Sequence, residues 1–333
     1  MRAILIAAAA FIVMAAQASA NPGYWKSEGW KTDFEKKEID LGDILSGGPP
    51  RDGIPPIDDP KFIAVADAEY SAMEPVITVN LNGEARAYPL SVLIWHEIVN
   101  DDFGGKAVAV TYCPLCDAAI VFDRTVDGTV LRFGTTGKLR NSDLVMWDDA
   151  TESWWQQFLG RAIVGDYTGT ELAMLPSRVE SWARFQERFP DGKVLVPTNP
   201  AMRRYGENPY VGYDESPWPF LYRGEVPEHV FAMQRVVKVG HRAWSLDLLQ
   251  QRKEIKAAGG ITLRWEPGQA TALGDRTIAE GNDIGNVTVQ RDGKDVVHDV
   301  TFLFSFHAFL PEGMIYVGCK PGETIPKPPV MCF

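Results

Sequence analysis

From residue 107 the sequence is Ala107-Val108-Ala109-Val110-Thr111-Tyr112-Cys113-Pro114-Leu115-Cys116, a mostly apolar run that ends in two cysteines. A second apolar run follows at 118–122, and Asp127-Gly128 then turns the chain into a third at 129–133. Short apolar runs separated by turn residues are typical of strands. Residues 107–133 therefore predict a three-stranded meander, with the two cysteines in its first turn.

Two further hairpins flank this meander. Residues 76–81 and 84–88 lie on either side of Asn82-Gly83, a dipeptide that strongly favours a tight hairpin turn. Near the C-terminus, Asp292-Gly293 separates 287–290 from a long stretch, 296–309, which we expect to be strand. Strands joined by such short turns are antiparallel.

Helix signals are fewer. Ser177 and Glu180 have the spacing of a capping box, and Ser245 is a suitable N-cap for a helix that Gly259-Gly260 would end. The predicted helices span 177–189, 246–258 and, shorter than these, 151–158.

The first hairpin region recurs later in the chain. Residues 83–93 resemble residues 240–249 after a one-residue gap, and both copies predict a hairpin turn, a strand and a helix. At this length, duplication and chance similarity both remain open. The predicted fold is β-rich α+β, with two related antiparallel β lobes and a few packing helices. The expected segments are a signal peptide at 1–20, an extended N-terminal arm at 21–60, a first lobe with the cysteine turn at 61–200, and a second lobe with the C-terminal tail at 201–333.

Composition excludes two classes of protein. The chain has 333 residues, of which 45% are hydrophobic, and its 33 basic and 44 acidic side chains give a net charge of −11. Intrinsic disorder requires fewer apolar residues, and a nucleic-acid-binding protein would carry a basic patch. We therefore expect a globular protein that does not bind nucleic acid.

The N-terminus has the pattern of an export signal. Arg2 precedes an apolar run at 3–16, and the small residues Ala18-Ser19-Ala20 complete a cleavage motif. This run is shorter than the roughly 20 residues that span a bilayer. The sequence thus predicts a periplasmic or secreted protein with no membrane span after cleavage.

Cys113 and Cys116 are the sharpest chemical signal. Two thiolates at this spacing can bind one metal ion, or oxidise to a disulfide. A thioredoxin pair would precede a helix, whereas strand is predicted here, and no second Cys-x-x-Cys completes a structural zinc site. Cu(I) accepts two thiolates with a third His or Met ligand, so copper is the expected metal and His96 and Met146 are the candidate ligands.

The other two cysteines have a simpler interpretation. Cys319 and Cys332 flank a Pro-rich tail, and a disulfide between them would pin the C-terminus. The chain-entropy estimate for such a loop is about 3 kcal/mol. A structural disulfide, or a pair of buried thiols, also remains an alternative for Cys113 and Cys116.

A polar loop offers a second candidate site. Arg140 can pair with a carboxylate, while Asn141 and Ser142 can donate and accept hydrogen bonds. The competing interpretation is a loop held by an Arg140–Asp143 ion pair. Aromatic and amide side chains follow at 154–157, and they either line a ligand site or form core. The candidate ligand-binding residues are Arg140, Asn141, Ser142, Asp143, Trp154 and Gln156.

Four short motifs carry a family resemblance: Trp95-His96-Glu97-Ile98-Val99-Asn100-Asp101, Thr111-Tyr112-Cys113-Pro114-Leu115-Cys116, Leu139-Arg140-Asn141-Ser142-Asp143-Leu144-Val145-Met146 and Trp154-Trp155-Gln156-Gln157. With them the chain resembles the exported bacterial domain-of-unknown-function 3179 family, from about Ser46 to the C-terminal strands. The sequence departs from the family pattern at Phe306-His307-Ala308-Phe309, where more Trp and Tyr are expected. The resemblance implies no particular chemistry.

Three functions are compatible with these patterns. The leading hypothesis is an exported protein that binds a soft metal, above all copper, at Cys113 and Cys116 for metal handling or redox chemistry. The second is a thiol–disulfide oxidoreductase that acts on a redox partner protein. The third is a non-enzymatic module that binds a small molecule or glycan and contains a structural disulfide. The sequence alone does not decide whether the protein is an enzyme.

Overall fold

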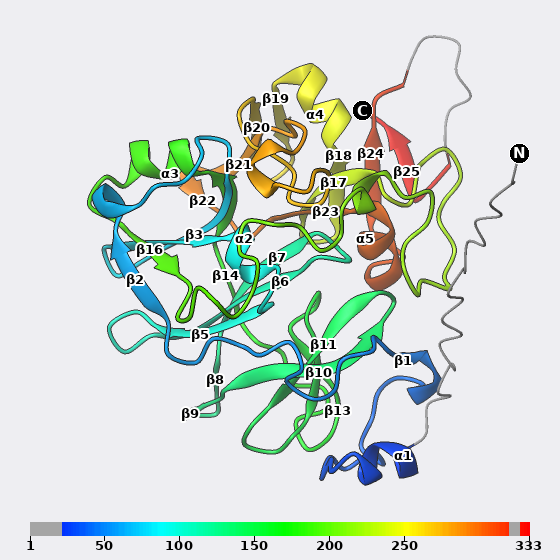
Figure 1. The fold of residues 1–333 in the computed structure, drawn as a ribbon. Coiled ribbons are helices and arrows are strands. Elements are labelled where there is room, and N and C mark those ends of the chain that lie inside the picture. Colours follow the sequence, from blue (N-terminus) through cyan, green and yellow to red (C-terminus); the bar gives the residue numbers. More distant parts are fainter. Residues whose placement is uncertain (1–21, 320–326) are drawn as a thin grey trace, which may run out of the picture.

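The structure of the protein, a computed structural model, describes residues 22–319 and 327–333. Strands dominate these residues and are accompanied by a few short helices, so the predicted β-rich α+β class is confirmed (Figure 1). The predicted signal peptide at 1–20 lies outside the described residues. Among the helices of the described residues, none has the length and hydropathy needed to cross a membrane.

The first five-stranded sheet is built on the Asn82-Gly83 hairpin. Both turn residues have positive φ, 53° and 81°, which a two-residue turn of this kind requires. A third strand adds antiparallel to one side of the hairpin, and a fourth adds parallel to the other. In order, the strands are β15 (Arg178–Ser181), β3 (Pro75–Leu81), β4 (Glu84–Pro89), β16 (Lys193–Val196) and β2 (Lys61–Ala64).

The second five-stranded sheet repeats this connectivity in its first four strands, but its fifth strand is parallel to its neighbour and comes last in the chain, whereas β2 is antiparallel and comes first in its lobe. Its hairpin is antiparallel, and the strand beyond the hairpin is again parallel to it. In order, its strands are β23 (Asp299–Phe302), β17 (Arg235–Val239), β18 (Arg242–Ser245), β24 (Met314–Val317) and β25 (Val330–Cys332). The helices occupy matching places: α2 (Leu90–Leu93) and α4 (Leu246–Arg252) follow the hairpins, while α3 (Trp182–Arg188) and α5 (Leu303–Phe309) connect the outer strands. Apart from the fifth strand, the two lobes therefore share one order of strands and helices.

Each hairpin and its helix lead into a four-stranded antiparallel sheet. In the first lobe the order is β14 (Met174–Leu175), β7 (Ala118–Asp123), β6 (Ala107–Cys113) and β5 (Ile98–Asp102). In the second it is β19 (Glu254–Ala257), β20 (Ile261–Glu266), β21 (Asn286–Arg291) and β22 (Lys294–Asp295). The predicted Asp292-Gly293 turn joins β21 directly to β22, whereas residues 124–173 separate β7 from β14 in the first lobe.

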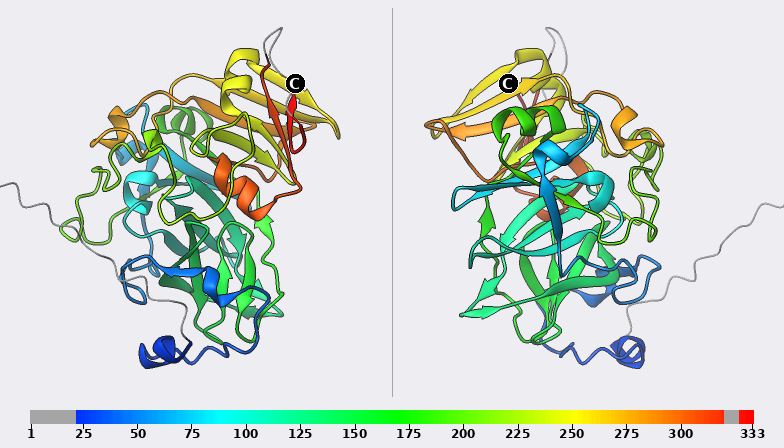
Figure 2. Two further views of the ribbon diagram at one scale, coloured as in Figure 1. Left: turned by 90° about the vertical axis from the view of Figure 1, so that its right-hand side faces the viewer. Right: turned by 60° about the vertical axis from the view of Figure 1, so that its left-hand side comes forward.

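This insertion, residues 124–173, forms a sheet of its own, which lies below the two lobes in Figures 1 and 2. Its strands are β10 (Phe133–Arg140), β11 (Asp143–Asp148), β12 (Trp154–Gln156) and β13 (Arg161–Val164), and β1 (Ile44–Ser46) pairs with β10. The prediction that residues 129–133 form one strand, the third of the meander, is wrong. It is divided between the small hairpin of β8 (Thr125–Val126) with β9 (Thr129–Val130) and the start of β10.

The N-terminal segment packs against the inserted sheet (Figure 2). After α1 (Pro22–Ser27) it passes over β12, where Trp25, Trp30 and Phe34 surround Trp154 with ring centroids 4.9 to 5.2 Å apart. Burying four aromatic rings in one cluster attaches the segment firmly to the sheet. Single 3₁₀ turns complete the described elements: η1 (Leu41–Asp43), η2 (Val65–Asp67), η3 (Tyr213–Glu215) and η4 (Ile278–Glu280).

Several predicted helix bounds are wrong. Residues 151–158 contain strand β12 instead of a helix, and the helix predicted over 177–189 begins only at Trp182, after β15. The helix predicted over 246–258 ends at Arg252 and is followed by β19. The expected strand at 296–309 is β23 followed by α5. The last three errors each join two adjacent short elements, because continuous apolar patterns do not mark the point where one kind of element changes to the other.

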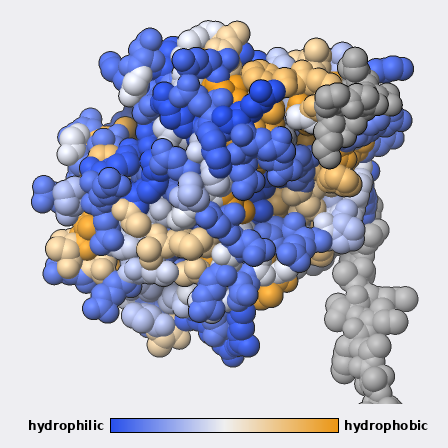
Figure 3. Space-filling view, turned by 90° about the horizontal axis from the view of Figure 1, so that it is seen from above, coloured by the Kyte–Doolittle hydropathy of each residue, from blue (hydrophilic) through white to orange (hydrophobic). Residues whose placement is uncertain are grey.

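The C-terminal cysteines are bonded to each other. Cys319 and Cys332 form the predicted disulfide, which joins the last residue of β25 to the second residue after β24. Viewed from above in Figure 3, the surface is mainly hydrophilic and its hydrophobic side chains form small separate groups. Such a surface is expected for a chain with a net charge of −11.

Candidate metal centre

The cysteine turn lies between β6 and β7, as predicted. Cys113 is the last residue of β6, and its carbonyl accepts a hydrogen bond from the Cys116 amide at 3.2 Å. Asp117 closes the turn in a left-handed conformation, with φ 50°. Both cysteines are buried and unbonded to each other, so the turn presents two thiols at one place.

A carboxylate completes a group of three potential ligands. The Sγ atoms of Cys113 and Cys116 and a carboxylate oxygen of Asp143 lie within 4.8 Å of one another, and all three residues are buried. Asp143 is the first residue of β11. The preceding hairpin turn, Asn141-Ser142, has positive φ at both positions, 49° and 66°, which brings the chain back sharply toward the cysteines.

The hydrogen bonds of Asp143 leave one of its oxygens open. Oδ2 accepts hydrogen bonds from Gln156 Nε2 at 2.6 Å and from the Phe158 amide at 2.9 Å. Oδ1 is buried and has no hydrogen-bond partner among the described residues. A buried carboxylate oxygen without a partner is costly, and a cation or a proton would satisfy it.

The second lobe holds the cysteine turn from behind. The Cys116 carbonyl accepts hydrogen bonds from Thr301 Oγ1 at 2.7 Å and from the Phe302 amide at 3.0 Å. The adjacent Asp117 forms an ion pair with Arg235, with Nε 2.7 Å from Oδ2. The turn is therefore fixed by both lobes.

The segment between the lobes, residues 197–234, covers the other side. Tyr213 donates a hydrogen bond to the Leu115 carbonyl at 3.1 Å, and Ser142 donates one to the Phe220 carbonyl. We call residues 197–234 the covering segment. It excludes water from the cysteine turn, which explains the full burial of the thiols.

This burial changes the protonation of every acid at the site. Desolvation raises the pKa of both thiols, with that of Cys116 moved well above its usual range. Desolvation also raises the pKa of Asp143 to about 6. Burial, and to a smaller extent repulsion from Asp143, raises the pKa of Glu97 to about 8. Near neutral pH the two thiols and Glu97 are therefore mostly protonated, whereas Asp143 is mostly ionised.

A buried lysine and aspartate lie behind these acids. Lys238, on β17, interacts electrostatically with Asp299 and Asp143, and its Nζ lies 4.8 Å from the centre of the Phe158 ring. Burial lowers the pKa of Lys238 and raises that of Asp299 to about 8. Lys238 forms no ion pair within 4.0 Å in the described part of the chain. Lys238 is thus a buried amine whose protonation is coupled to the charges of Asp299 and Asp143.

The structure does not bring His96 into the group of ligands. Its Nδ1 lies 2.7 Å from the Pro55 carbonyl and its Nε2 lies 2.8 Å from Tyr205 Oη. Since a carbonyl only accepts, Nδ1 carries the proton, and Nε2 accepts from the tyrosine hydroxyl. Both ring nitrogens are occupied, so His96 anchors the covering segment, and the residue that lies with the two cysteines is Asp143.

Met146 also lies away from the carboxylate. It is fully buried in the main hydrophobic core. Met146 and Asp143 are three residues apart on β11, so their side chains leave the strand on opposite faces. Core packing accounts for Met146.

The predicted ligand-binding residues form two groups. Arg140, Gln156 and Asp143 are linked, since Arg140 Nη1 lies 3.5 Å from Gln156 Oε1 and Gln156 Nε2 donates to Asp143. Asn141 and Ser142 form the turn between β10 and β11. Trp154 is not with them, because it is enclosed by the aromatic rings of the N-terminal segment. An Arg140–Asp143 ion pair is absent from the described residues; Arg140 lies instead 3.7 Å from Asp43.

Sequence reasoning missed three charged groups of the site. These three are Glu97, Lys238 and Asp299. Asp143 was predicted, but as a contact for a small molecule and not for a metal. One signal was present for Lys238, which interrupts the apolar strand Val236-Val237-Lys238-Val239. A charged residue inside a buried strand indicates a specific role.

Comparison with known proteins gives a family without a described activity. The family model described as "Protein of unknown function (DUF3179)" matches residues 51–313, which is most of the chain. The chain belongs to this family. No curated protein and no solved structure matches it. For this DUF3179 member, the geometry of the site is consequently the main guide to its chemistry.

Proposed function

We propose that the protein binds a thiophilic metal ion through Cys113, Cys116 and Asp143. The observation that carries the proposal is the convergence of two thiols and a carboxylate oxygen within 4.8 Å in a buried site. The unpartnered Oδ1 of Asp143 supports it, because a bound cation would satisfy that oxygen. Metal binding would displace the thiol protons, as it does at other cysteine sites.

The donor set favours a divalent ion. Thiolates bind both Cu(I) and Zn²⁺, but a carboxylate oxygen is a normal ligand of Zn²⁺ and a poor one for a soft monovalent ion. Two thiolates and one carboxylate carry three negative charges, so a divalent ion leaves one, which Lys238 can balance. We therefore propose Zn²⁺ ahead of the copper expected from the sequence.

The fourth coordination position has a nearby candidate. Glu97 interacts electrostatically with both Asp143 and Cys113. Its carboxyl group has no hydrogen bond among the described residues and is almost entirely buried. Glu97 would either bind the metal as a fourth ligand or leave that position to water or substrate, as in catalytic zinc sites.

The thiol–disulfide oxidoreductase hypothesis has less support. Redox-active thiols are partly exposed and have a lowered pKa, which makes the thiolate available. Here both thiols are buried and their pKa values are raised. The proposal that the protein acts in the periplasm or outside the cell rests on the N-terminal signal pattern alone.

Competition titrations test the proposal. We expect the reduced metal-free protein to take up one equivalent of Zn²⁺ and to prefer it to Cu⁺ when both compete with chelators of known affinity. Cys113→Ser/Cys116→Ser should take up neither ion, and Asp143→Ala should bind Zn²⁺ about 10- to 100-fold more weakly.

The matched control is Cys319→Ser/Cys332→Ser, which removes the other two cysteines and should bind Zn²⁺ like the wild type. Equimolar metal retained by Cys113→Ser/Cys116→Ser would overturn the site. A wild-type protein that binds neither ion would overturn the function. Preference for Cu⁺ would keep the site and reverse the choice of metal.

A further inference from the structure

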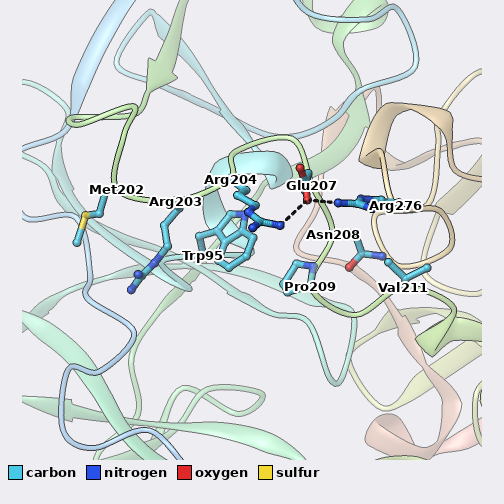
Figure 4. Close-up of a pocket in the computed structure, with 9 residues that line it drawn as sticks. All are labelled: Trp95, Met202, Arg203, Arg204, Glu207, Asn208, Pro209, Val211 and Arg276. Atoms are coloured by element: carbon cyan, nitrogen blue, oxygen red, sulfur yellow. Dashed lines mark hydrogen bonds and ion pairs between the residues drawn. The ribbon is translucent and has the colours of Figure 1, made fainter. Parts of the chain in front are cut away.

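A cavity of about 520 Å³ lies at the covering segment (Figure 4). It is lined by Trp95 at the end of the α2 region, by residues 202–211 of the covering segment, and by Arg276 from the connection between β20 and β21. None of the three proposed metal ligands lines it. Its volume falls in the range of sites that enclose small organic ligands.

Backbone pairing makes part of this cavity rigid. Glu207 and Thr277 form an isolated antiparallel bridge. The Asn208 amide donates to the Arg276 carbonyl at 2.8 Å, and the Ile278 amide donates to the Gly206 carbonyl at 3.0 Å. Glu207 and Arg276 thus project from paired backbone, so this wall exists before any ligand arrives.

The cavity is positively charged in a chain that is otherwise acidic. Arg203, Arg204 and Arg276 line it with a single acid, Glu207, against a net charge of −11 for the whole chain. Arg276 lies 3.3 Å and Arg204 3.7 Å from Glu207 Oε2. Figure 4 shows the two guanidinium groups approaching this carboxylate from different sides. Arg203 has no ion pair within the described residues.

Most of the guanidinium donors are therefore free. Each guanidinium carries five N–H donors. In the described part of the chain, Arg276 uses one of them on a side-chain acceptor, at Glu207, and Arg203 and Arg204 use none. Arginine forks match the geometry of planar carboxylates. Because Glu207 already pairs with Arg204 and Arg276, a ligand carboxylate would use the guanidinium donors that Glu207 leaves free.

An apolar surface adjoins these charges. Trp95 and Pro209 line the cavity, and Met202 and Val211 expose 45% and 58% of their surface. Trp95 Nε1 is buried and has no hydrogen-bond partner among the described residues. A tryptophan face and flanking apolar side chains favour a flat, apolar ligand body.

We infer that this cavity binds a small aromatic carboxylate, with its ring against Trp95 and its carboxylate on Arg204 and Arg276, whereas the Arg203 side chain points away from them (Figure 4). The combination of planar apolar surface with unused guanidinium donors points to this class of ligand, because inorganic phosphate would use the donors and leave the apolar surface exposed. The inference does not depend on metal binding by Cys113 and Cys116.

Binding of 2-naphthoate, followed by its fluorescence and by calorimetry on the full-length protein, tests the inference. We expect saturable binding of one equivalent, and at least tenfold weaker binding of the uncharged analogue 2-naphthalenemethanol. Arg204→Gln/Arg276→Gln should weaken naphthoate binding at least tenfold. Arg223→Gln is the matched control, since Arg223 is an exposed arginine of the covering segment outside this cavity, and it should bind naphthoate like the wild type.

Four results would overturn the inference: no binding of naphthoate at millimolar concentration, equal affinity for the uncharged analogue, equal loss of affinity in the Arg223→Gln control, or displacement of naphthoate by an equal concentration of inorganic phosphate. Trp95→Leu provides a second check on the ring contact, and it should weaken naphthoate more than it weakens acetate. The same titration in Cys113→Ser/Cys116→Ser should be unchanged, which separates this cavity from the metal centre.

Discussion

Asp143 occupies a position where its ionised form is disfavoured. Its carboxyl group is fully buried, and burial raises its pKa from 3.8 to about 6 despite the hydrogen bonds from Gln156 and Phe158. A carboxyl group with a raised pKa in the folded state lowers stability at any pH at which the unfolded chain is ionised. Such a residue is retained for function more readily than for stability.

Asp143→Asn should therefore stabilise the metal-free protein at pH 7. The asparagine oxygen can still accept from Gln156 and Phe158, while the ionisation cost disappears. A shift of this size corresponds to about 1–3 kcal/mol. The gain in stability should be complete above pH 6 and should shrink as the pH falls from 6 toward 4. In that range Asp143 is already protonated in the folded wild type, and it becomes protonated in the unfolded chain as well. Urea unfolding of both proteins with EDTA at pH 4.5 and 7 measures it, and a variant less stable than wild type at pH 7 would contradict the assignment.

At this scale the sequence indicated one part of the site well. The Cys113/Cys116 turn is local, since its strands and turn residues are contiguous, and its geometry follows from the pattern. Asp143 and Lys238 reach the site only through folding, from the insertion and from the second lobe. The spacing of residues along the sequence contains no signal for such contacts. His96 is predicted as a ligand because imidazole binds metals, but its hydrogen bonds with Pro55 and Tyr205 exist only in the folded chain.

Among the elements, α4 shows what a cap contributes. Ser245 precedes the helix, and its Oγ accepts a hydrogen bond from the Leu248 amide at 3.3 Å, as the sequence indicated. Ser181 precedes α3 in the equivalent place but forms no capping hydrogen bond. Ser245→Ala should lower the free energy of unfolding by about 1 kcal/mol, with a clearly smaller loss for Ser181→Ala. Chemical denaturation of the two variants measures the difference, and equal losses would remove the role assigned to the cap.

The covering segment is the element that controls access to the thiols. Tyr213→Phe removes its hydrogen bond to the Leu115 carbonyl, worth about 1 kcal/mol, and should speed alkylation of Cys113 and Cys116 about fivefold. Ser216→Ala is the control, because Ser216 Oγ donates only within the segment, to the Trp218 carbonyl. Mass spectrometry of iodoacetamide-treated protein measures the rates. Equal rates in both variants would show that the thiols are reached by another route.

Elements were predicted well where the turn was explicit. The Asn82-Gly83 and Asp292-Gly293 hairpins depend on residues that favour positive φ, a local property. The failures were at 151–158 and 296–309, where apolar and polar residues have no clear period. At 296–309 a strand passes directly into α5, and tertiary packing of Leu303 and Phe306 in the core, rather than propensity, selects the helix.

Across the whole molecule, the site exists because the two lobes differ. They share one order of strands and helices, but only the first has Cys-x-x-Cys after its central strand. The corresponding β20 ends at Glu266, and Pro267-Gly268-Gln269 follows. The insertion found only in the first lobe supplies Asp143, and the second lobe supplies Lys238 and the hydrogen bonds to Cys116. Two lobes with the same order of elements are thus asymmetric around one centre: the first lobe contains the cysteine turn and the second supports it.

Arg235 connects this centre to the second lobe, and its loss should be costly. Its guanidinium pairs with Asp117 at 2.7 Å and with Asp214 at 3.3 Å, and all three side chains are largely buried. Arg235→Met would leave two buried carboxylates without their counter-charge, a loss of about 3–5 kcal/mol in the free energy of unfolding. The control is Arg161→Met, which removes an exposed arginine paired with Glu38 and Glu171 and should cost about 1 kcal/mol or less.

Adding Asp117→Asn and Asp214→Asn to Arg235→Met should restore part of the loss, because neutral amides need no counter-charge. Urea unfolding measures all three proteins. Equal costs at Arg235 and Arg161, or no recovery with the two amides, would mean that charge does not hold the cysteine turn against the second lobe.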